Sequence, residues 1–514
     1  MTNPTTAPGP TGWSSLKLLN PYQWFVLIVC CLAWDLDCLD QQLFVLARRP
    51  AMVELVPKVA ENDPRLVEFG AKLTAKATEQ NKPAPSAPEI RAALQNADVA
   101  DSATYATSFF MLGWAVGGIG FGVMGDKVGR VKTLTLTILL YAIFTGISAI
   151  SVGTMDFFAY RFLTGLGVGG VFAAAVTLLA ETMPEPSRPF ALGLFQASSV
   201  LGNCSAALIS MWLGNLKAGG SLDGLKLGSF DLSPWRIMFL IGILPGLLVV
   251  LVQLKLKEPE KWLAMKAEGG RKGSLYGALF QDRRWAKHAI VGLILALAGV
   301  IGLWGIAFFS ADLQQYVAEP QYKQEAVQKG LATTEQLASG KLPPEAQKYV
   351  DGQKAFWAGI TSLVQNGGAF VGIFAFSMIT ARIGRKPTFA FFFIMAGLST
   401  AGVFLFLKSW SDIFWMVPIM GFFQLALFGG YAIYFPELFP THLRSTGTSF
   451  CYNVGRLIAA FGPFALGMLT SRVFSNLPAP EPFRYAGVTM CSIFLLGLLA
   501  LPFLPETKGK PLPE

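Results

Sequence analysis

The sequence has few charged residues and almost no histidine for its length. Of its 514 residues, 14% are Asp, Glu, Lys or Arg, and two are histidines, His288 and His442. The chain is 53% hydrophobic with a mean hydropathy of +0.48, and no soluble domain of this length could bury so many apolar side chains. The composition therefore predicts a protein that crosses a membrane several times.

Cysteine is also scarce, and none lies in a loop. The six cysteines fall inside apolar segments, so the sequence offers neither a loop disulfide nor the Cys/His spacing of a metal site. There is no Walker motif for ATP, and two histidines leave no convincing Ser/His/Asp set. We expect no metal, no cofactor and no enzymatic activity. The net charge of +9 is explained by basic loops beside a membrane, so we expect no nucleic-acid partner.

Twelve apolar segments are long enough to span a bilayer, at about 20 residues each. The fold class predicted is therefore an all-α membrane protein with twelve transmembrane helices, which an internal repeat divides into two pseudo-symmetric six-helix bundles. The first six spans are expected near 22–47, 104–124, 133–151, 157–180, 190–214 and 235–256. The second six are expected near 288–312, 355–379, 388–407, 411–435, 445–471 and 484–504.

These spans divide the chain into segments. We expect an N-terminal tail (1–21), an N-terminal bundle (22–256) with a long outer loop (48–102), a cytoplasmic linker (257–287), a C-terminal bundle (288–504) with its own outer loop (318–354), and a C-terminal tail (505–514). Lys and Arg gather in the linker and in alternate short loops, which places both termini in the cytoplasm. The absence of loop cysteines favours a bacterial inner membrane.

An internal repeat supports two matching halves. The segment Gly125-Asp126-Lys127-Val128-Gly129-Arg130 returns as Thr380-Ala381-Arg382-Ile383-Gly384-Arg385, an offset of 384 − 129 = 255. Glu181 and Arg188 return as Glu437 and Arg444, an offset of 437 − 181 = 256. Two motifs at nearly one offset indicate a duplicated six-helix unit.

The long outer loops carry shorter matches at the same offset. Thr78-Glu79-Gln80 matches Thr334-Glu335-Gln336, and Pro88-Glu89 matches Pro344-Glu345. The two loops are therefore predicted to be duplicated counterparts, although short matches also arise by chance. Loops of this length need structure of their own or a partner.

With these spans and the paired motif Gly125-x-x-x-Gly129-Arg130, the chain resembles the major facilitator superfamily. Glycines allow close helix contact, and Asp126 can pair with a base or a helix N-terminus of the neighbouring bundle. The resemblance implies a gating contact on the cytoplasmic side. The second copy has Ala381 in place of Asp126, so its contact is expected to be weaker. The alternative is that the charged residues of this motif only set the orientation of the helices in the membrane. The predicted gating set is Gly125, Asp126, Lys127, Gly129, Arg130, Arg382, Gly384, Arg385, Glu181, Arg188, Glu437 and Arg444.

Two branches of this superfamily compete. The segment from Arg161 to Gly170 and the tail Pro505-Glu506-Thr507-Lys508-Gly509 resemble sugar porters. The segment from Phe435 to Gly447, Tyr452-Asn453-Val454-Gly455-Arg456, and the Asp37-x-x-Asp40 pair resemble proton-coupled symporters of aromatic acids, sialate and lactate. The weight of the motifs favours the organic-acid side.

The first predicted span contains three acidic residues, Asp35, Asp37 and Asp40. A carboxylate at the centre of a lipid-facing helix costs about 2.5–3.5 kcal/mol, so these groups must face protein, water or each other. At about 100° per residue, Asp37 and Asp40 share one face, whereas Asp35 points elsewhere. Because burial and a like charge one turn away both favour the protonated form, we predict that Asp37 and Asp40 carry the coupled proton. The alternative is an Asp40 that stays hydrated at the outer interface, helped by Arg48 and Arg49.

Arg456 lies at membrane depth in the eleventh span, where a cation must face the interior and find an anion. A guanidinium can hold a carboxylate with two hydrogen bonds, and Tyr452 lies one turn away on the same face. The alternative is a structural ion pair with a buried acid. Arg161, in the fourth span, either joins the binding site or extends to the interface. The other predicted substrate-binding residues are Asn453, Gln365, Asn366, Gln424 and Tyr431.

The sequence thus predicts a secondary transporter that carries a small organic anion with protons by alternating access, within a lipid bilayer and as a monomer. A sugar or polyol symporter, a proton exchanger, and a membrane sensor that transports nothing are the alternatives.

Overall fold

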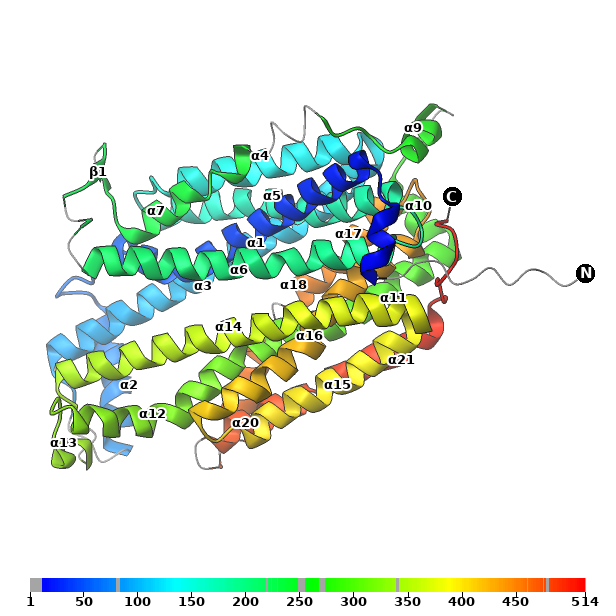
Figure 1. Ribbon diagram of the computed structural model, residues 1–514. Helices are drawn as coiled ribbons and strands as arrows, with labels where there is room; N and C mark the ends of the chain where they lie inside the picture. The colour runs from blue at the N-terminus through cyan, green and yellow to red at the C-terminus, as the bar shows by residue number, and fades with distance from the viewer. Residues whose placement is uncertain are drawn as a thin grey trace, which may run out of the picture.

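The computed structural model is almost entirely helical (Figure 1). It describes residues 12–79, 84–218, 221–222, 224–228, 230–247, 255–267, 273–338, 342–459, 461–474, 476–477 and 480–513. Within these ranges, ten helical segments are long and apolar enough to cross a membrane, judged by length and composition.

The helices form two bundles that lie side by side. The N-terminal bundle contains α1 (Pro21–Leu55), α3 (Ala87–Lys127), α4 (Arg130–Ser148), α5 (Thr154–Thr182), α6 (Arg188–Ala218) and α7 (Pro234–Ile241). The long helices of the C-terminal bundle are α11 (Arg283–Val300), α14 (Pro344–Ile383), α15 (Arg385–Phe406) and α16 (Ile413–Leu438). The last two predicted spans are built from α17 (Arg444–Ser449), η5 (Phe450–Val454), α18 (Gly455–Ala459), α19 (Gly462–Met468), η6 (Leu469–Val473), α20 (Glu481–Met490), α21 (Ile493–Ala500) and η7 (Leu501–Phe503).

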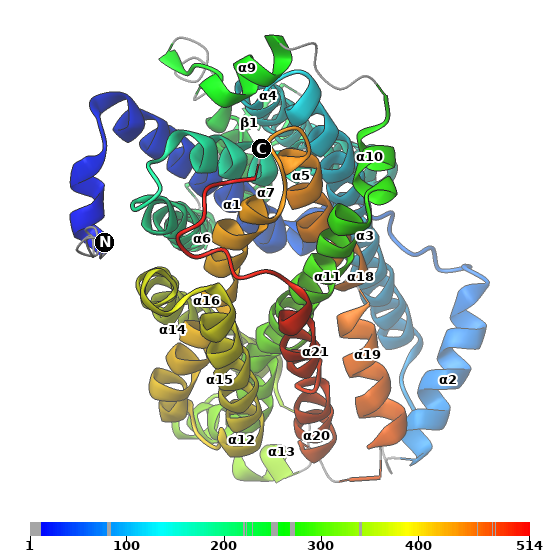
Figure 2. The ribbon, with the colours of Figure 1, turned by 90° about the vertical axis from the view of Figure 1, so that its right-hand side faces the viewer.

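The shorter elements lie at the two ends of the bundles. The terminal end carries η1 (Gly12–Leu18), α9 (Glu260–Ala267), α10 (Leu275–Gln281) and the chain after η7 (Figures 1 and 2). The opposite end, called the loop end, carries α2 (Arg65–Glu79), α13 (Thr334–Ala338), and a hairpin of β1 (Lys226–Leu227) and β2 (Phe230–Asp231) paired antiparallel. A short turn, η4 (Trp410–Asp412), precedes α16.

Several predicted spans are not described as single continuous α-helices. The sixth is described only as α7 and the turn that follows it, because residues 248–254 lie outside the described part of the chain. The eleventh begins as α17 and passes through the π-helical turn η5 before α18. The seventh also contains a π-helical turn, η2 (Ile301–Ile306), followed by η3 (Ala307–Phe309). Such turns re-aim side chains and are frequent at functional sites.

The predicted boundaries of the outer loops need correction, because both loops are largely helical. Helix α1 continues to Leu55, and α12 (Ser310–Gln328) prolongs the seventh span beyond the expected edge. Pro88 is the second residue of α3 and Pro344 the first of α14, and these helices end at Lys127 and Ile383, again 256 apart (383 − 127). The Pro-Glu match therefore marks equivalent helix starts.

The Thr-Glu-Gln match behaves differently. Thr78 lies at the end of α2, whereas Thr334 opens α13. Gln80 lies outside the described residues, and the threonines of the two copies are not at equivalent places in the fold.

The motif glycines sit where the backbone requires glycine. Gly129 and Gly384 immediately precede α4 and α15, with φ of +132° and +103°. Other residues are strained in this region, so these positions explain why glycine recurs in both halves.

Candidate functional site

The two bundles are joined at the terminal end by Asp126. Its carboxylate accepts hydrogen bonds from the backbone N–H groups of Ser445 (3.1 Å) and Thr446 (2.8 Å) and from the Thr446 hydroxyl (2.7 Å). Asp126 is on α3, and its partners open α17 in the other half. A Cβ on Gly125 would overlap the Ser445 hydroxyl, so glycine permits this close contact. The predicted contact with a helix start of the opposite bundle is present.

Glu181 links two arginines at the same place. Arg130 donates to both Glu181 oxygens at 3.0 Å, and Arg444 donates to one of them at 2.6 Å. Arg130 and Glu181 belong to the N-terminal half and Arg444 to the C-terminal half, and all three side chains are buried. Arg130 also donates to the Thr441 carbonyl of the other half at 2.7 Å. The Arg444–Glu181 ion pair therefore joins the two halves at the terminal end. We call this junction of the two halves at the terminal end the seam.

Arg385 and Glu437 of the second motif copy pair within their own half, whereas Arg444 of the same copy crosses to Glu181. Arg385 donates to the Glu437 oxygens at 3.0 and 2.7 Å, and the Thr507 hydroxyl donates to Glu437 as well. Arg188 has an Nε atom without a partner among the described residues, although Glu437 acts on it electrostatically. Lys127 and Arg382 are exposed. The two motif copies thus differ in what they join.

Two glutamates outside the repeated motifs also make contacts at the terminal end. Glu258 accepts from the backbone N–H groups of Arg130 (2.7 Å) and Val131 (3.0 Å), and Glu506 accepts from those of Arg385 (2.9 Å) and Lys386 (3.0 Å). Burial raises the pKa of Glu506, but these and two further backbone N–H groups outweigh it and hold the pKa below the ordinary value. Their offset is 506 − 258 = 248, which explains why a search at 255–256 does not find them.

Arg456 of α18 lies between aromatic rings from both halves. Its guanidinium carbon is 3.9 Å from the ring centroid of Trp114 on α3 and 4.2 Å from that of Tyr452. It donates to the Tyr452 hydroxyl at 2.7 Å, and the Tyr452 ring stacks on Phe172 of α5 at 3.8 Å. The pair predicted from the sequence is therefore together. Trp114 and Phe172 were not predicted, because an aromatic residue in an apolar span gives no polar signal.

Arg456 retains hydrogen-bonding capacity. Its Nε and Nη1 atoms are buried and have no partner among the described residues. Asp37 accepts from the Gln41 side chain at 2.7 Å through one oxygen, while the other is unpaired, and the charge of Arg456 acts on Asp37. The Trp34 indole N–H, also buried, is unpaired as well. A donor-rich group with one nearby carboxylate can accept a further anion.

Asp40 lies deeper in the N-terminal bundle. It is fully buried, which excludes the alternative of hydration beside Arg48 and Arg49. The nearby cation is Arg161, also fully buried, which packs on the rings of Phe44, Phe157 and Phe239 and therefore does not reach an interface. Arg161 donates to the Ser148 hydroxyl and the Phe144 carbonyl and acts on Asp40 electrostatically. It is not brought to the group formed by Arg456, Tyr452, Trp114 and Phe172, called the Arg456 group.

Asp35 points toward α6; helical spacing predicts that it leaves the face shared by Asp37 and Asp40 but does not predict this neighbour. A Cβ on Gly202 would lie 3.1 Å from an Asp35 oxygen, so this carboxyl group packs at the contact between α1 and α6. On α6 the next residue, Asn203, donates to Asn366 of α14 at 3.3 Å, a further contact between the halves. Gln365 is buried beside Gly421 of α16.

Three predicted binding residues are held by other partners. Asn453 donates to the Gly169 carbonyl (3.2 Å) and the Ser449 hydroxyl (2.9 Å), so its amide nitrogen joins the halves. Gln424 donates to Thr400, and Tyr431 donates to the Leu295 carbonyl at 2.8 Å. The last two are buried inside the C-terminal bundle, and the structure does not bring them to Arg456.

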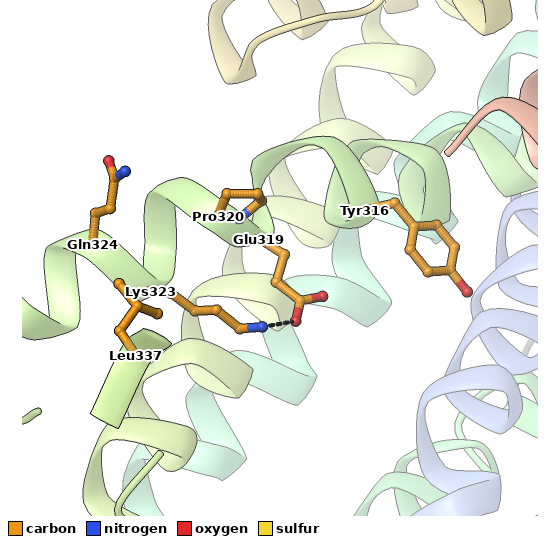
Figure 3. Close-up of a pocket in the computed structure, with 6 residues that line it drawn as sticks. All are labelled: Tyr316, Glu319, Pro320, Lys323, Gln324 and Leu337. Carbon is orange, nitrogen blue, oxygen red and sulfur yellow. Dashed lines mark ion pairs between the residues drawn. The ribbon is translucent and has the colours of Figure 1, made fainter. Parts of the chain in front are cut away.

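A separate pocket of about 330 Å³ lies beside α12 (Figure 3). Tyr316, Glu319, Pro320, Lys323, Gln324 and Leu337 line it. Lys323 and Lys354 pair with Glu319 at 2.7 and 2.8 Å and, against the effect of burial, hold the pKa of Glu319 below its ordinary value. These charges satisfy one another, so the pocket offers no unpaired charge to a ligand.

Comparison with known proteins gives consistent matches. The sequence profile of the Major Facilitator Superfamily matches residues 83–333. The chain is 29% identical over 409 residues to a protein of Haemophilus influenzae named as a metabolite transport protein, covering 78% of this chain and 86% of that one. It is 28% identical over 373 residues to the cis,cis-muconate transport protein of Acinetobacter baylyi, covering 71% and 77%. Among solved structures, the proton:xylose symporter bound to 6-bromo-6-deoxy-D-glucose aligns with a TM-score of 0.63 at 16% identity, covering 96% of this chain and 98% of that one.

Proposed function

This chain belongs to the major facilitator superfamily, and from that membership we propose that it carries a small organic carboxylate across a membrane together with protons. It is a membrane transporter and not an enzyme. The observation that carries the substrate class is the buried guanidinium of Arg456 at the junction of the halves, two of whose nitrogens have no hydrogen-bond partner in the part of the chain that the structure describes.

The environment of Arg456 favours a flat carboxylate. A buried cation without a full set of partners is costly, so an incoming carboxylate that accepts from Nε or Nη1 would be bound strongly. Trp114, Tyr452 and Phe172 supply ring faces next to it. The relative from Acinetobacter baylyi, whose name states cis,cis-muconate transport, supports a conjugated acid as the first probe.

The coupling ion proposed is the proton. Asp37 and Asp40 are buried one turn apart, and a buried carboxyl group is stable only when protonated or paired. Arg161 can balance Asp40, and Arg456 can balance Asp37. When substrate carboxylate takes Arg456, Asp37 loses its balancing charge and would bind a proton. This competition would link the two fluxes.

Alternating access would use the seam at the terminal end. We place this end in the cytoplasm on the distribution of Lys and Arg, and we propose the bacterial inner membrane as the location. The bundles 22–256 and 288–504 would rock about the Arg456 group, with 257–287 as their linker. Each cycle would then break and remake the contacts of Asp126 and Glu181.

The test is uptake by the purified chain in proteoliposomes. Carbon-14 cis,cis-muconate should accumulate when the outside is acidic, and unlabelled benzoate or nicotinate should compete, whereas glucose, xylose and mannitol should not. Liposomes without protein are the control. Uptake that requires sodium and does not depend on the pH gradient would refute proton coupling. Competition by sugars but not by carboxylates would show that the substrate is a sugar.

A further inference from the structure

The N-terminal helix η1 contacts both halves of the molecule. It runs from the start of α1 past α6 of the N-terminal half toward α14 of the C-terminal half (Figures 1 and 2). The Trp13 ring packs edge-on against Phe190 of α6, with the ring centroids 5.0 Å apart, and stacks on Phe374 of α14 at 5.9 Å. Phe190 and Phe374 also contact each other at 5.6 Å. Three rings from the two halves therefore form one cluster.

The base of η1 is fixed to the N-terminal half. The Asn20 side chain accepts from the Gln23 backbone N–H at 2.8 Å, and the Gln23 side chain accepts from the Asn20 backbone N–H at 3.0 Å, which forms a capping box at the start of α1. The Gln23 amide also donates to the carbonyl of Thr182, the last residue of α5, at 3.1 Å. Leu16 of η1 is buried. Helix η1 is therefore an arm of the N-terminal half whose tip, Trp13, reaches the other half.

The two helices that Trp13 bridges pack closely near the terminal end. A Cβ on Gly193 of α6 would overlap the Ser377 hydroxyl of α14, so the helices touch at this level. Phe190 is the third residue of α6, and Phe374 lies in the last quarter of α14. In the rocking motion about Arg456 proposed above, these ends of α6 and α14 move apart when the terminal end opens.

We propose that η1 with Trp13, which we call the N-terminal clasp, holds the two halves together at the terminal end and releases Phe374 each time that end opens. The inference rests on the proposed alternating access. A contact that exists in one of two conformations stabilises that conformation by its own free energy. Aromatic contacts add to the effect of burial and carry no net charge. The clasp therefore acts independently of the ion pair between Glu181 and Arg444, on a different pair of helices.

Trp13 can be replaced without opening a cavity, because 65% of the residue is exposed. Its removal should therefore leave the fold intact. Leu18 provides a matched control, because it is an exposed apolar residue of the same helix outside the ring cluster.

The first experiment measures the distance between the halves by pulsed electron resonance, with spin labels at positions 185 and 382 of cysteine-free, full-length protein. Trp13→Ala and Leu18→Ala are each introduced into the wild-type sequence and into Glu181→Gln, which weakens the seam. We expect Trp13→Ala to raise the ratio of open to closed molecules about 2- to 10-fold, the range of one lost aromatic contact, and Leu18→Ala to leave it unchanged. An unchanged ratio in Trp13→Ala, or an equal rise in both variants, would overturn the clasp.

The second experiment tests release of the clasp. In cysteine-free protein, Trp13→Cys is combined with Phe374→Cys of the other half or, as the matched control, with Phe190→Cys of the same half. A short, reducible reagent with two thiol-reactive ends joins each pair, and uptake of carbon-14 cis,cis-muconate into proteoliposomes is measured before and after joining.

Joining positions 13 and 374 should stop uptake until a reductant is added, whereas joining positions 13 and 190 should leave uptake unchanged. Full uptake with positions 13 and 374 completely joined would overturn the clasp, because transport would then not require its release. Equal loss of uptake in both joined proteins would also overturn it. Failure of the wild-type chain to take up any carboxylate would instead refute the proposed function, and the spin-label distances would still test the clasp.

Discussion

The seam at the terminal end makes a quantitative prediction through Glu181. Replacing it with Gln keeps the shape and removes the charge that Arg130 and Arg444 share. Removing one partner of a buried ion pair costs about 3–5 kcal/mol in total. Only the bond to Arg444 crosses between the halves, and one hydrogen bond to a charged group is worth about 1.5–3 kcal/mol. The equilibrium should therefore move about 10- to 150-fold toward a terminal end that is open.

The assay measures the distance between the halves directly. Spin labels at positions 185 and 382, both exposed at the terminal end, would report separation by pulsed electron resonance in a cysteine-free background. The matched control is Glu437→Gln, because the hydrogen bonds of Glu437 among the described residues, to Arg385 and Thr507, all lie within the C-terminal half. Glu181→Gln should populate a longer distance and Glu437→Gln should not. Unchanged distances in Glu181→Gln, or equal changes in both variants, would refute the reasoning.

Two further predictions concern Arg456 and Glu506. Arg456→Lys should raise the KM for muconate about 10- to 100-fold, because a lysine cannot present the same planar donors. Initial uptake rates measured over a range of muconate concentrations give this KM. An unchanged KM would indicate that Arg456 is a structural residue. Glu506→Gln should lower the midpoint of thermal unfolding at neutral pH. The pKa of Glu506 in the folded protein is held below its ordinary value of 4.5. The ionised carboxylate therefore stabilises the folded state fully above pH 4.5, and this stabilisation is lost as the pH falls through the lowered pKa. The difference between the two proteins should therefore shrink in acid, and a difference independent of pH would contradict the capping role.

Much of this fold could be predicted from the sequence because hydropathy and repeated motifs are local signals. Gly129 and Gly384 mark turns with positive φ, and Asp126 reaches the opposite half as its motif indicates. The broken eleventh span could not be predicted. A continuous apolar run looks the same whether the backbone is α-helical or passes through a π-helical turn such as η5.

The candidate site could be predicted only in part. Helical spacing placed Tyr452 with Arg456 and separated Asp35 from Asp37, because these relations depend on one helix. Spacing does not show which neighbour a buried polar residue faces. Tyr431 and Gln424 therefore gave the same signal as true members of the Arg456 group.

The most direct test of the account is the movement of protons with the substrate. Muconate is added outside proteoliposomes that hold a pH-sensitive dye, with no gradient imposed, for wild type and for Asp40→Asn. For wild type, the account predicts that the interior acidifies at the rate at which radiolabel enters. For Asp40→Asn, it predicts either radiolabel entry without acidification or no entry and no acidification. Radiolabel entry through wild type with no proton movement, or equal acidification by both proteins, would contradict it.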